Sequence, residues 1–428
     1  MAIEYLGLSS INGPLVVLEG LQDAFYDEIV EFTIEGKQQK MGRIIELNED
    51  KAVIQVFEGT ENMSLQNTHT KLTGRPMEVA VSPDMLGRTF NGIGEPVDGL
   101  GPIVSTDRRD VNGLPLNPVK REYPRNYIRT GISAIDGLTT LIRGQKLPIF
   151  SGNGLPHDQL AAQIVKQASL GEGAEGEFAV VFGAMGVKHD VAEFFRKTFE
   201  ESGVSDHVCM FLNLANDPVV ERLITPKVAL TAAEYLAFEC NMHILVILTD
   251  MTSFAEAMRE VSSSKGEIPS RKGYPGYLYS ELATIYERAG IVESANGSVT
   301  QLPILTMPND DITHPIPDLT GYITEGQIVL DRNLHGQAVY PPISILPSLS
   351  RLMKDGIGEG YTREDHQDLA NQLFSAYAKV GEARNLASVI GEDELSPIDK
   401  QYLKFGEEFE HRYIGQGPNK SDRSHVVL

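Results

Sequence analysis

Cysteine, basic side chains and long apolar runs are all scarce in this sequence of 428 residues. The two cysteines, Cys209 and Cys240, lie inside apolar runs without metal-site spacing, which excludes a disulfide framework and indicates buried, reduced thiols. The longest apolar runs, such as 178–185 and 244–248, are much shorter than the roughly 18 residues that a membrane-spanning helix needs. Residues 1–10 have no basic region and no long apolar stretch, so we expect no signal peptide.

The deficit of basic residues excludes another class of protein. The chain has 37 Lys and Arg residues against 59 Asp and Glu residues, a formal net charge of −22. Such a surplus of acid repels a phosphate backbone, and no basic stripe along the sequence offsets it, so we expect no nucleic-acid partner. With 41% hydrophobic residues, a chain of this length can bury several cores, which excludes disorder and favours about three domains.

The sequence divides into three regions of different texture. In residues 1–74, short apolar stretches separated by glycines and turns predict a β-barrel, with strands at 14–18, 27–34, 41–47 and 52–57. Residues 75–359 begin with a Gly/Pro-rich tract, expected to be an extended crossing loop, and continue as alternating strand and helix patterns. Residues 360–428 show helical patterns and no strands, end in a Gly, Asn, Ser and Asp-rich tail at 415–428 that we expect to be frayed, and form the third predicted domain.

The alternation in the central region predicts a mostly parallel sheet with helices on both faces, an α/β core of the P-loop NTPase type. Ligands of such sheets bind at the carboxyl ends of the strands. The helix at 226–240 is expected to begin at Pro226, because proline suits the first turn. The predicted strands are 146–151, 178–182, 208–212 and 243–248, and the predicted helices are 158–169, 188–201, 226–240, 362–380 and 396–413.

The first candidate site is the glycine-bearing segment 147–158, between a predicted strand and a predicted helix. Backbone N–H groups and the helix dipole could hold a phosphate at this point. A functional Walker A motif ends in Gly-Lys-Ser/Thr, whereas Pro156, His157 and Asp158 occupy these positions. Proline removes an amide donor, neutral histidine adds little charge, and aspartate repels an anion. Two interpretations stay open, an inert strand-loop-helix turn and a weakened nucleotide site.

The second candidate is Asp250, which ends the apolar run 243–248 after Thr249. An apolar strand that ends in aspartate resembles a Walker B strand, whose carboxylate holds magnesium directly or through water. The alternative is an ordinary buried strand with a terminal aspartate. The position of Asp250, several strand-helix units after the glycine-bearing loop, favours a P-loop-type core.

Two further segments carry candidate chemistry. The run 309–318 contains three acids and a histidine, so it could bind a metal, but its two prolines favour a rigid extended loop. In 341–353, Arg351 follows a proline-rich stretch that we expect to be a stiff loop. A guanidinium held in this way could reach a phosphate on a neighbouring subunit, and the alternative is a surface arginine on a structural loop.

Together these segments resemble one family. The chain is similar to the B subunit of A-type and V-type rotary ATPases, within the larger family that includes the α and β subunits of F-type ATP synthases. The similarity runs in order through nearly the whole chain, from the predicted barrel to the helical end. The matching stretches are 11–15, 55–60, 131–136, 143–151, 154–157, 230–237, 273–277, 320–328 and 347–351.

The resemblance implies a non-catalytic subunit. In this family three B subunits alternate with three catalytic A subunits around a central rotor stalk, with peripheral stalks and a separate membrane sector that moves protons or sodium ions. Only the A subunit carries the intact phosphate loop, so ATP or ADP would lie at the interfaces with Mg²⁺ held mainly by A. By motif position Arg351 would be an arginine finger acting in trans. A weak or vestigial nucleotide site would map to Phe150, Gly152, Gly154, His157, Asp158 and Asp250.

The same resemblance implies several negative features and a location. We expect no metal site and no tightly bound nucleotide in this chain alone, and only indirect membrane contact at the cytoplasmic face. Two departures from the family pattern stand out. Ser344 occupies a position where the family usually has Asn or Asp, and the chain stops at Leu428 where relatives usually continue. We therefore expect a truncated C-terminal helical domain.

Two other functions stay open at this point. A self-sufficient ATP-driven motor of the same superfamily, such as a secretion ATPase or an RNA translocase, would be favoured by a lysine at position 157, where this chain has histidine. A structural scaffold without a catalytic role would not require Arg351. The leading hypothesis is a B subunit that couples ATP hydrolysis or synthesis to ion transport.

Overall fold

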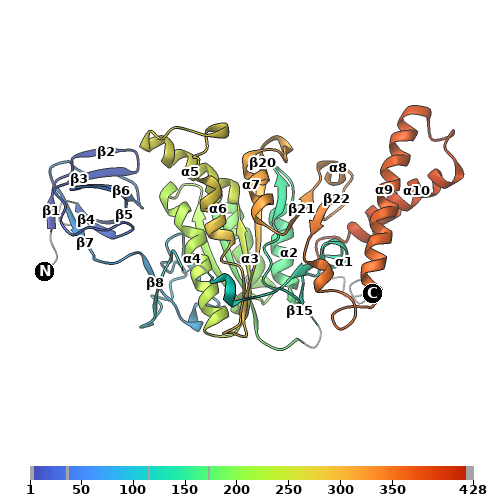
Figure 1. Cartoon of the computed structure of the whole chain (residues 1–428), viewed down its shortest axis with the longest axis horizontal. Helices are drawn as coiled ribbons and strands as arrows, with labels where there is room; N and C mark the ends of the chain where they lie inside the picture. The colour runs from blue at the N-terminus through green and yellow to red at the C-terminus, as the bar shows by residue number, and fades with distance from the viewer. Residues whose placement is uncertain (1–3, 35–37, 114–115, 172–173, 421–428) are drawn as a thin grey trace.

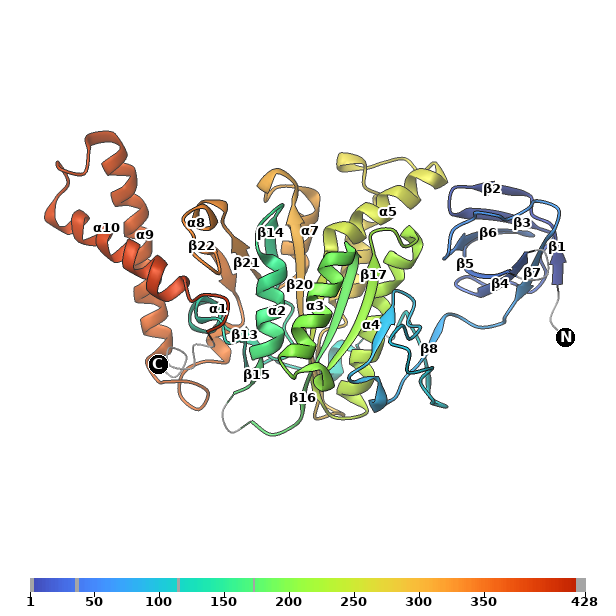
Figure 2. The same cartoon turned by 180° about the vertical axis from the view of Figure 1, so that it is seen from behind.

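The computed structural model describes residues 4–34, 38–113, 116–171 and 174–420. Three parts follow one another along the long axis of the molecule (Figure 1), with a small sheet domain at one end, an α/β core in the middle and two long helices at the other end. The view from behind shows the same order (Figure 2). The predicted fold class is therefore confirmed.

The N-terminal part is a seven-stranded antiparallel sheet in the order β1-β7-β4-β5-β6-β3-β2, curled around its own apolar core. Burial alternates along β4, so that Val30 and Phe32 point into this core together with Val16, Ile44 and Ile54. The four predicted strands correspond to β3 to β6. The strands are β1 (Glu4–Leu6), β2 (Ser10–Asn12), β3 (Leu15–Glu19), β4 (Ile29–Ile34), β5 (Gln38–Asn48), β6 (Lys51–Val56) and β7 (Thr68–Leu72).

The Gly/Pro-rich segment that follows is not only a crossing loop. It contains β8 (Glu78–Ala80), β9 (Thr89–Asn91) and β10 (Arg108–Asp110). Strand β9 adds to the edge of the central sheet beside β17 (Val208–Leu214). Next to it, Arg88 Nε lies 2.6 Å from Asp98 Oδ2, and this hydrogen-bonded ion pair lowers the pKa of Asp98 to about 2.

The central sheet has the strand order β22-β21-β14-β20-β18-β16-β17-β9, and its strands are parallel except for β22 at one edge. A short antiparallel pair, β11 and β19, extends it beside β20. Its remaining strands are β11 (Arg121–Glu122), β14 (Ile149–Gly152), β16 (Phe178–Val187), β18 (His243–Thr249), β19 (Gly290–Val292), β20 (Ser298–Met307), β21 (Gly326–Leu330) and β22 (Ile343–Ser350). A separate small sheet contains β12 (Tyr127–Arg129), β13 (Leu141–Ile142) and β15 (Ser169–Leu170).

Helices cover both faces of this sheet, and alternate residues of its strands face opposite cores. Phe182 packs in one core with α2 and α3, while its neighbour Val181 packs in the other with α4, α5, α6 and α7. The helices are α1 (Ser133–Leu138), α2 (His157–Gln167), α3 (His189–Glu201), α4 (Val219–Phe238), α5 (Met251–Lys265), α6 (Leu278–Tyr286), α7 (Pro315–Ile323) and α8 (Arg332–Gly336).

Three local predictions are wrong. Helix α4 begins at Val219 and contains Pro226 in its interior, because the helix is buried on nearly all sides and packing outweighs the cost of proline. Pro315 does not lie in an extended loop but begins α7, where its missing N–H costs no hydrogen bond. The stretch before Arg351 is not a loop, because residues 343–350 form strand β22 at the sheet edge, where Pro347 is tolerated.

The C-terminal part contains α9 (His366–Ile390) and α10 (Pro397–Phe409), which pack against each other. Glu410 joins them, because its buried carboxylate accepts hydrogen bonds from Tyr377 (2.6 Å) and from Arg384 (2.7 and 2.9 Å). Within the described ranges, no helix combines the length and the apolar character needed to cross a lipid bilayer. The expected C-terminal truncation concerns sequence beyond residue 420, outside the described residues.

The buried guanidinium of Arg288 gives a stability prediction. This side chain is 4% exposed and donates to both carboxylate oxygens of Glu234 (2.6 and 2.7 Å) and to the carbonyl of Val111 (2.9 Å). Arg288→Met should lower the free energy of unfolding by about 3 to 5 kcal/mol, because Glu234 is left without its partner. The exposed control Arg196→Met should lose less than about 1 kcal/mol. Urea unfolding followed by circular dichroism measures both, and equal small losses would contradict the prediction.

A buried carboxyl on α4 predicts a pH dependence. Burial, reinforced by Asp217, Glu58 and Glu95, raises the pKa of Glu221 from 4.5 to about 7. The folded chain therefore holds this proton more tightly than the unfolded chain, and the stability contributed by the neutral group falls as the pH rises from about 4.5 to 7. Glu221→Gln should remove this loss.

The measurement is the melting temperature between pH 4.5 and 8. The advantage of Glu221→Gln over the unmodified chain should grow up to about pH 7 and then stay constant. The exposed control Glu407→Gln should follow the unmodified chain throughout. A constant difference across the whole range would show that Glu221 does not titrate as described.

Candidate functional site at the carboxyl ends of the parallel strands

The structure brings most of the predicted loop residues together at one edge of the sheet. Strand β14 ends at Gly152 and α2 begins at His157, so the loop between them lies at the carboxyl end of β14. Asp250 directly follows β18, and a single strand, β20, separates β18 from β14. Phe150 lies in β14 itself, 2% exposed, and its side chain belongs to the apolar core.

The glycine-bearing loop is closed on itself. The Oγ of Ser151 and Nδ1 of His157 are 2.9 Å apart, so the two ends of the loop share a hydrogen bond. Inside the loop, the amide of Leu155 donates to the carbonyl of Gly152 (3.1 Å), and the amide of His157 donates to that of Leu155 (2.9 Å). Pro156 has no amide to donate. The amides of Leu155 and His157, which a phosphate-binding loop would direct at its ligand, are therefore used within the loop.

An ion pair that the sequence did not reveal holds this loop from outside. Arg332 Nε lies 2.6 Å from Asp310 Oδ2, and Nη2 of Arg332 donates to the carbonyl of Asn153 (2.9 Å). A Cβ at Gly152 would lie 2.1 Å from Asp310 Oδ1, so only glycine allows the pair to sit this close. Gly154 adopts a φ of +78°, which glycine accommodates without strain. Neither Gly152 nor Gly154 is free to be replaced without disturbing the loop.

The electrostatics beside the loop disfavour a polyphosphate. Burial raises the pKa of Asp158, and the neighbouring carboxyls of Asp250 and Asp190 add to this rise, while His157 opposes it. Asp158 also lies close to His157, with 3.7 Å between Oδ1 and Nε2. A bound nucleotide would bring its own negative charge to a place where carboxyls already crowd one another.

Asp250 already has structural partners. Its Oδ1 accepts from the amides of Thr252 (2.9 Å) and Thr306 (3.2 Å), and its Oδ2 accepts from Thr306 Oγ1 (2.7 Å). The carboxylate therefore caps α5 and ties β18 to β20. A magnesium ion at Asp250 would have to share oxygens that already hold these elements together. Among the residues described, no three His, Cys, Asp or Glu side chains form a group that could hold a metal.

Arg351 lies at the opposite end of the strands from the loop. It follows β22, which runs antiparallel to β21, with Ser350 opposite Gly326 at the amino end of β21. Its side chain is exposed, and its Nη1 makes only a long contact, 3.5 Å, to the carbonyl of Thr324. The nearby Glu325 carboxylate instead binds Lys146 Nζ at 2.7 Å. No carboxylate of the described residues forms an ion pair with Arg351, so its charge is available to an external anion.

Serine side chains fix the strand that presents Arg351. Ser350 donates to the carbonyl of Thr140 (2.8 Å) and accepts from Gln145 Nε2 (3.0 Å). Ser348 accepts from the amide of Val329 (2.9 Å), where the register of β21 and β22 shifts, and donates to the carbonyl of Ser344. At Ser344 the backbone carbonyl thus provides the attachment, so the strand is pinned without an Asn or Asp side chain there.

Three family profiles match the chain and together cover most of its length. Residues 131–350 match the nucleotide-binding domain of the ATP synthase alpha/beta family, and residues 8–74 match the beta-barrel domain of that family. Residues 355–426 match the C-terminal domain of V and A type ATP synthase. The glycine-bearing loop, Asp250 and the strand that precedes Arg351 all fall within the first of these matches.

Similar proteins span nearly the whole chain. The V-type ATP synthase beta chain 2 of Clostridium tetani is 65% identical over 97% of this chain and 91% of its own length. The B subunit of the A-type ATP synthase of Aeropyrum pernix is 58% identical over 98% of this chain and 90% of its own length. A solved structure of an ATP synthase subunit, NeqB from Nanoarcheaum equitans, superimposes with a TM-score of 0.75 at 40% identity, covering 97% of this chain and 96% of that one.

The chemistry of the loop predicts how its affinity can be raised. The combined replacement Pro156→Gly, His157→Lys and Asp158→Thr adds an amide donor and a positive charge and removes a carboxyl. One added hydrogen bond to a charged group is worth about 1.5 to 3 kcal/mol, so the affinity for MgADP should rise at least roughly tenfold. Isothermal titration calorimetry measures it, with Gln159→Ala as the exposed control on the same helix. An unchanged affinity would show that the backbone hydrogen bonds of the loop and its contact with Arg332, rather than these three side chains, prevent binding.

Proposed function

Because this chain belongs to the ATP synthase alpha/beta family as a B subunit of the A/V type, we propose that it supplies the non-catalytic side of an interface at which a neighbouring A subunit hydrolyses or synthesises ATP. The observation that carries this proposal is the contrast between Arg351 and this chain's own glycine-bearing loop. Arg351 is exposed and has no carboxylate partner among the described residues, whereas the loop is closed and lacks the catalytic lysine.

In this proposal Arg351 acts in trans. Its guanidinium is always charged and presents a planar fork of donors, which suits the oxygens of a γ-phosphoryl group whose negative charge spreads in the transition state. The attachment of Ser350 to Thr140 and Gln145 holds the preceding backbone, so the guanidinium would be oriented before the neighbour's nucleotide arrives. Lys146 contributes indirectly, because it binds the Glu325 carboxylate that could otherwise neutralise Arg351.

The chain's own nucleotide position is proposed to be weak or vestigial. Gly152, Gly154, His157 and Asp158 would surround it, with Asp250 nearby, and Phe150 would support it only from within the core. The loop hydrogen bonds and the raised pKa of Asp158 support low affinity. Mg²⁺ would then be held mainly by the A subunit, whose phosphate loop would carry the catalytic lysine.

The proposed assembly is a ring of three A and three B subunits around a central rotor stalk, with peripheral stalks outside it. The opposite placement of the loop and Arg351 supports a ring, because each subunit then offers a different surface to each of its two neighbours. The ring would sit at the cytoplasmic face of a membrane and couple ATP turnover to proton or sodium movement through a separate membrane sector.

The test of this proposal is the turnover of a reconstituted complex. The purified chain alone should hydrolyse ATP negligibly. Arg351→Ala in a complex with a partner that carries an intact phosphate loop should lower ATP turnover at least about a hundredfold, because an arginine finger acting in trans is worth about 10³ to 10⁵ in rate. Arg351→Lys should recover only part of the loss, since an ammonium cannot fork onto two oxygens.

The matched control is Lys354→Ala, which removes an exposed charge three residues further along and should leave turnover close to normal. Size-exclusion chromatography should show that both variants still assemble. Near-normal turnover in the Arg351→Ala complex, or substantial hydrolysis by the isolated chain, would overturn the proposal.

A further inference from the structure

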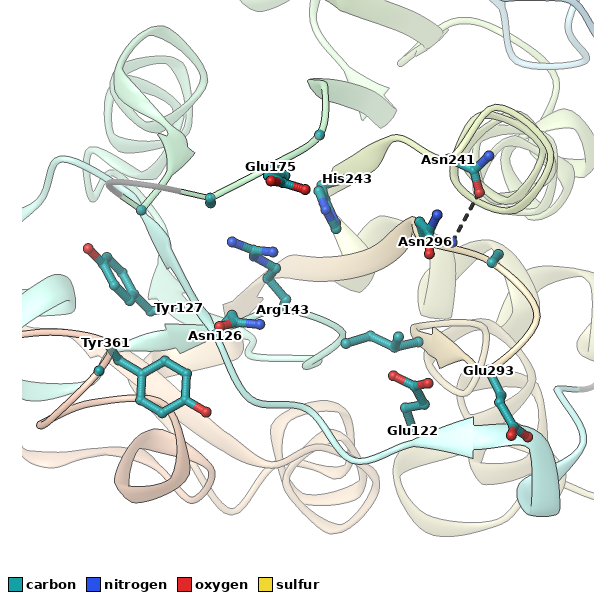
Figure 3. A pocket seen from close by; sticks show the side chains of 16 residues that line it. Glu122, Asn126, Tyr127, Arg143, Glu175, Asn241, His243, Glu293, Asn296 and Tyr361 are labelled. Carbon is teal, nitrogen blue, oxygen red and sulfur yellow. Dashed lines mark hydrogen bonds between the residues drawn. The ribbon is translucent and has the colours of Figure 1, made fainter.

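A cavity lies at the end of the central sheet where the parallel strands begin, opposite the glycine-bearing loop. Its volume is about 760 Å³, within the range of small-molecule sites. His243 is the first residue of β18, and Glu175 precedes β16, so both lie at the amino edge, whereas the phosphate loop lies at the carboxyl edge. Figure 3 shows the side chains that line it, including Glu122, Arg143, Glu175, His243, Glu293 and Tyr361.

The floor of this cavity holds the buried cation Arg143, which forms no ion pair with a carboxylate of the described residues. Arg143 is 8% exposed, its guanidinium is directed into the cavity toward the space between Tyr127 and His243 (Figure 3), and its Nε has no hydrogen-bond partner within the described part of the chain. No carboxylate there forms an ion pair with it either. Burial lowers the pKa of Arg143, as expected for a charge removed from water. Such a group costs several kcal/mol unless an anion accompanies it.

His243 beside it is satisfied and neutral. Its Nδ1 shares a hydrogen bond with Ser298 Oγ at 2.8 Å, and its ring also bonds to the backbone of Glu175. Burial, and then the charge of Arg143, lowers the pKa of His243. The positive charge on the floor therefore comes from Arg143, among the lining residues that the structure describes.

The rim of the cavity has the opposite charge. Glu122, Glu175 and Glu293 are exposed and stand around the opening (Figure 3). Three carboxylates repel a ligand that carries several phosphates, but they attract a cation. Asn126 and Asn296 line the same cavity and provide amide donors and acceptors.

We propose that this cavity binds a small zwitterion of the amino-acid type, with its carboxylate against Arg143 and its cationic group toward the glutamate rim. A carboxylate matches the guanidinium fork with two parallel hydrogen bonds and supplies a counterion that none of the described residues provides for Arg143. The rim selects against polyphosphates and favours a ligand with a positive end. The nucleotide position lies at the opposite edge of the sheet, and Arg351, although it is at the same edge as the cavity, is not among the residues that line it.

The test uses the full chain and ligand-observed saturation-transfer NMR, with L-lysine as the probe. L-lysine should bind, and lysinamide, acetate and inorganic phosphate should each bind at least tenfold more weakly, because each lacks the carboxylate, the cation or both. Arg143→Met should abolish L-lysine binding, whereas Arg125→Met, an exposed arginine on the preceding segment, should not change it. Arg351→Ala should not change it either.

Folding is controlled separately. Arg143→Met should melt no lower than the unmodified chain, since it replaces a buried charge that has no ion-pair partner among the described residues by an apolar side chain. If this variant does not fold, the exposed Glu293→Gln decides, because it should weaken L-lysine binding and strengthen phosphate binding. Absence of L-lysine binding to the unmodified chain, equal binding by Arg143→Met, or tighter binding of phosphate than of L-lysine would each overturn the proposal.

Discussion

Strand β21 pairs in parallel with β14 on one side and antiparallel with β22 on the other, and the positions of both candidate sites, the glycine-bearing loop and Arg351, depend on this pairing. The parallel pairing helps to place the end of β14, and hence the phosphate loop, at the carboxyl edge of the sheet. The antiparallel pairing returns the chain to the amino edge and leaves Arg351 there. A slip of one residue in either register would turn each strand's buried side chains to its other face, so the hydrophobic cores fix the distance between the two sites.

Polar side chains determine which ligands the glycine-bearing loop and Arg351 can bind. At the loop, Ser151, His157, Arg332 and Asp310 use donors and charges that a nucleotide would otherwise engage. At Arg351 the arrangement is the reverse, since Lys146 binds the carboxylate of the nearby Glu325 and the guanidinium has no carboxylate partner among the described residues, only a long contact to the carbonyl of Thr324. The exposed charge of Arg351 is therefore available to an external anion.

Much of the fold and the character of the glycine-bearing loop could be predicted from the sequence, because both depend on local patterns of residues. Apolar periodicity located β16, β18 and the helices α2, α3, α4, α9 and α10, and the altered Walker positions indicated an inert or weakened loop, whereas α1, α5, α6, α7 and α8 were not predicted. Strands β1, β2 and β7 were missed because they are short or rich in polar residues, as in Thr68–Leu72. The Asp310–Arg332 pair joins residues from separate elements and has no local signal. The predicted helix start at Pro226 and the predicted extended loop at Pro315 were wrong, because tertiary burial and position within a helix decide where proline is tolerated.

The ion pair between Arg332 and Asp310, which lies against Gly152, would also limit how the sequence of the loop can change. A lone His157→Lys change would restore one catalytic side chain but would leave Pro156, Asp158 and the clamp through Asn153 in place. A single substitution would therefore leave most of the contacts that close the loop unchanged. In the proposed assembly, this would make the loop hard to convert into a catalytic one by single substitutions and would keep the roles of the two kinds of subunit separate.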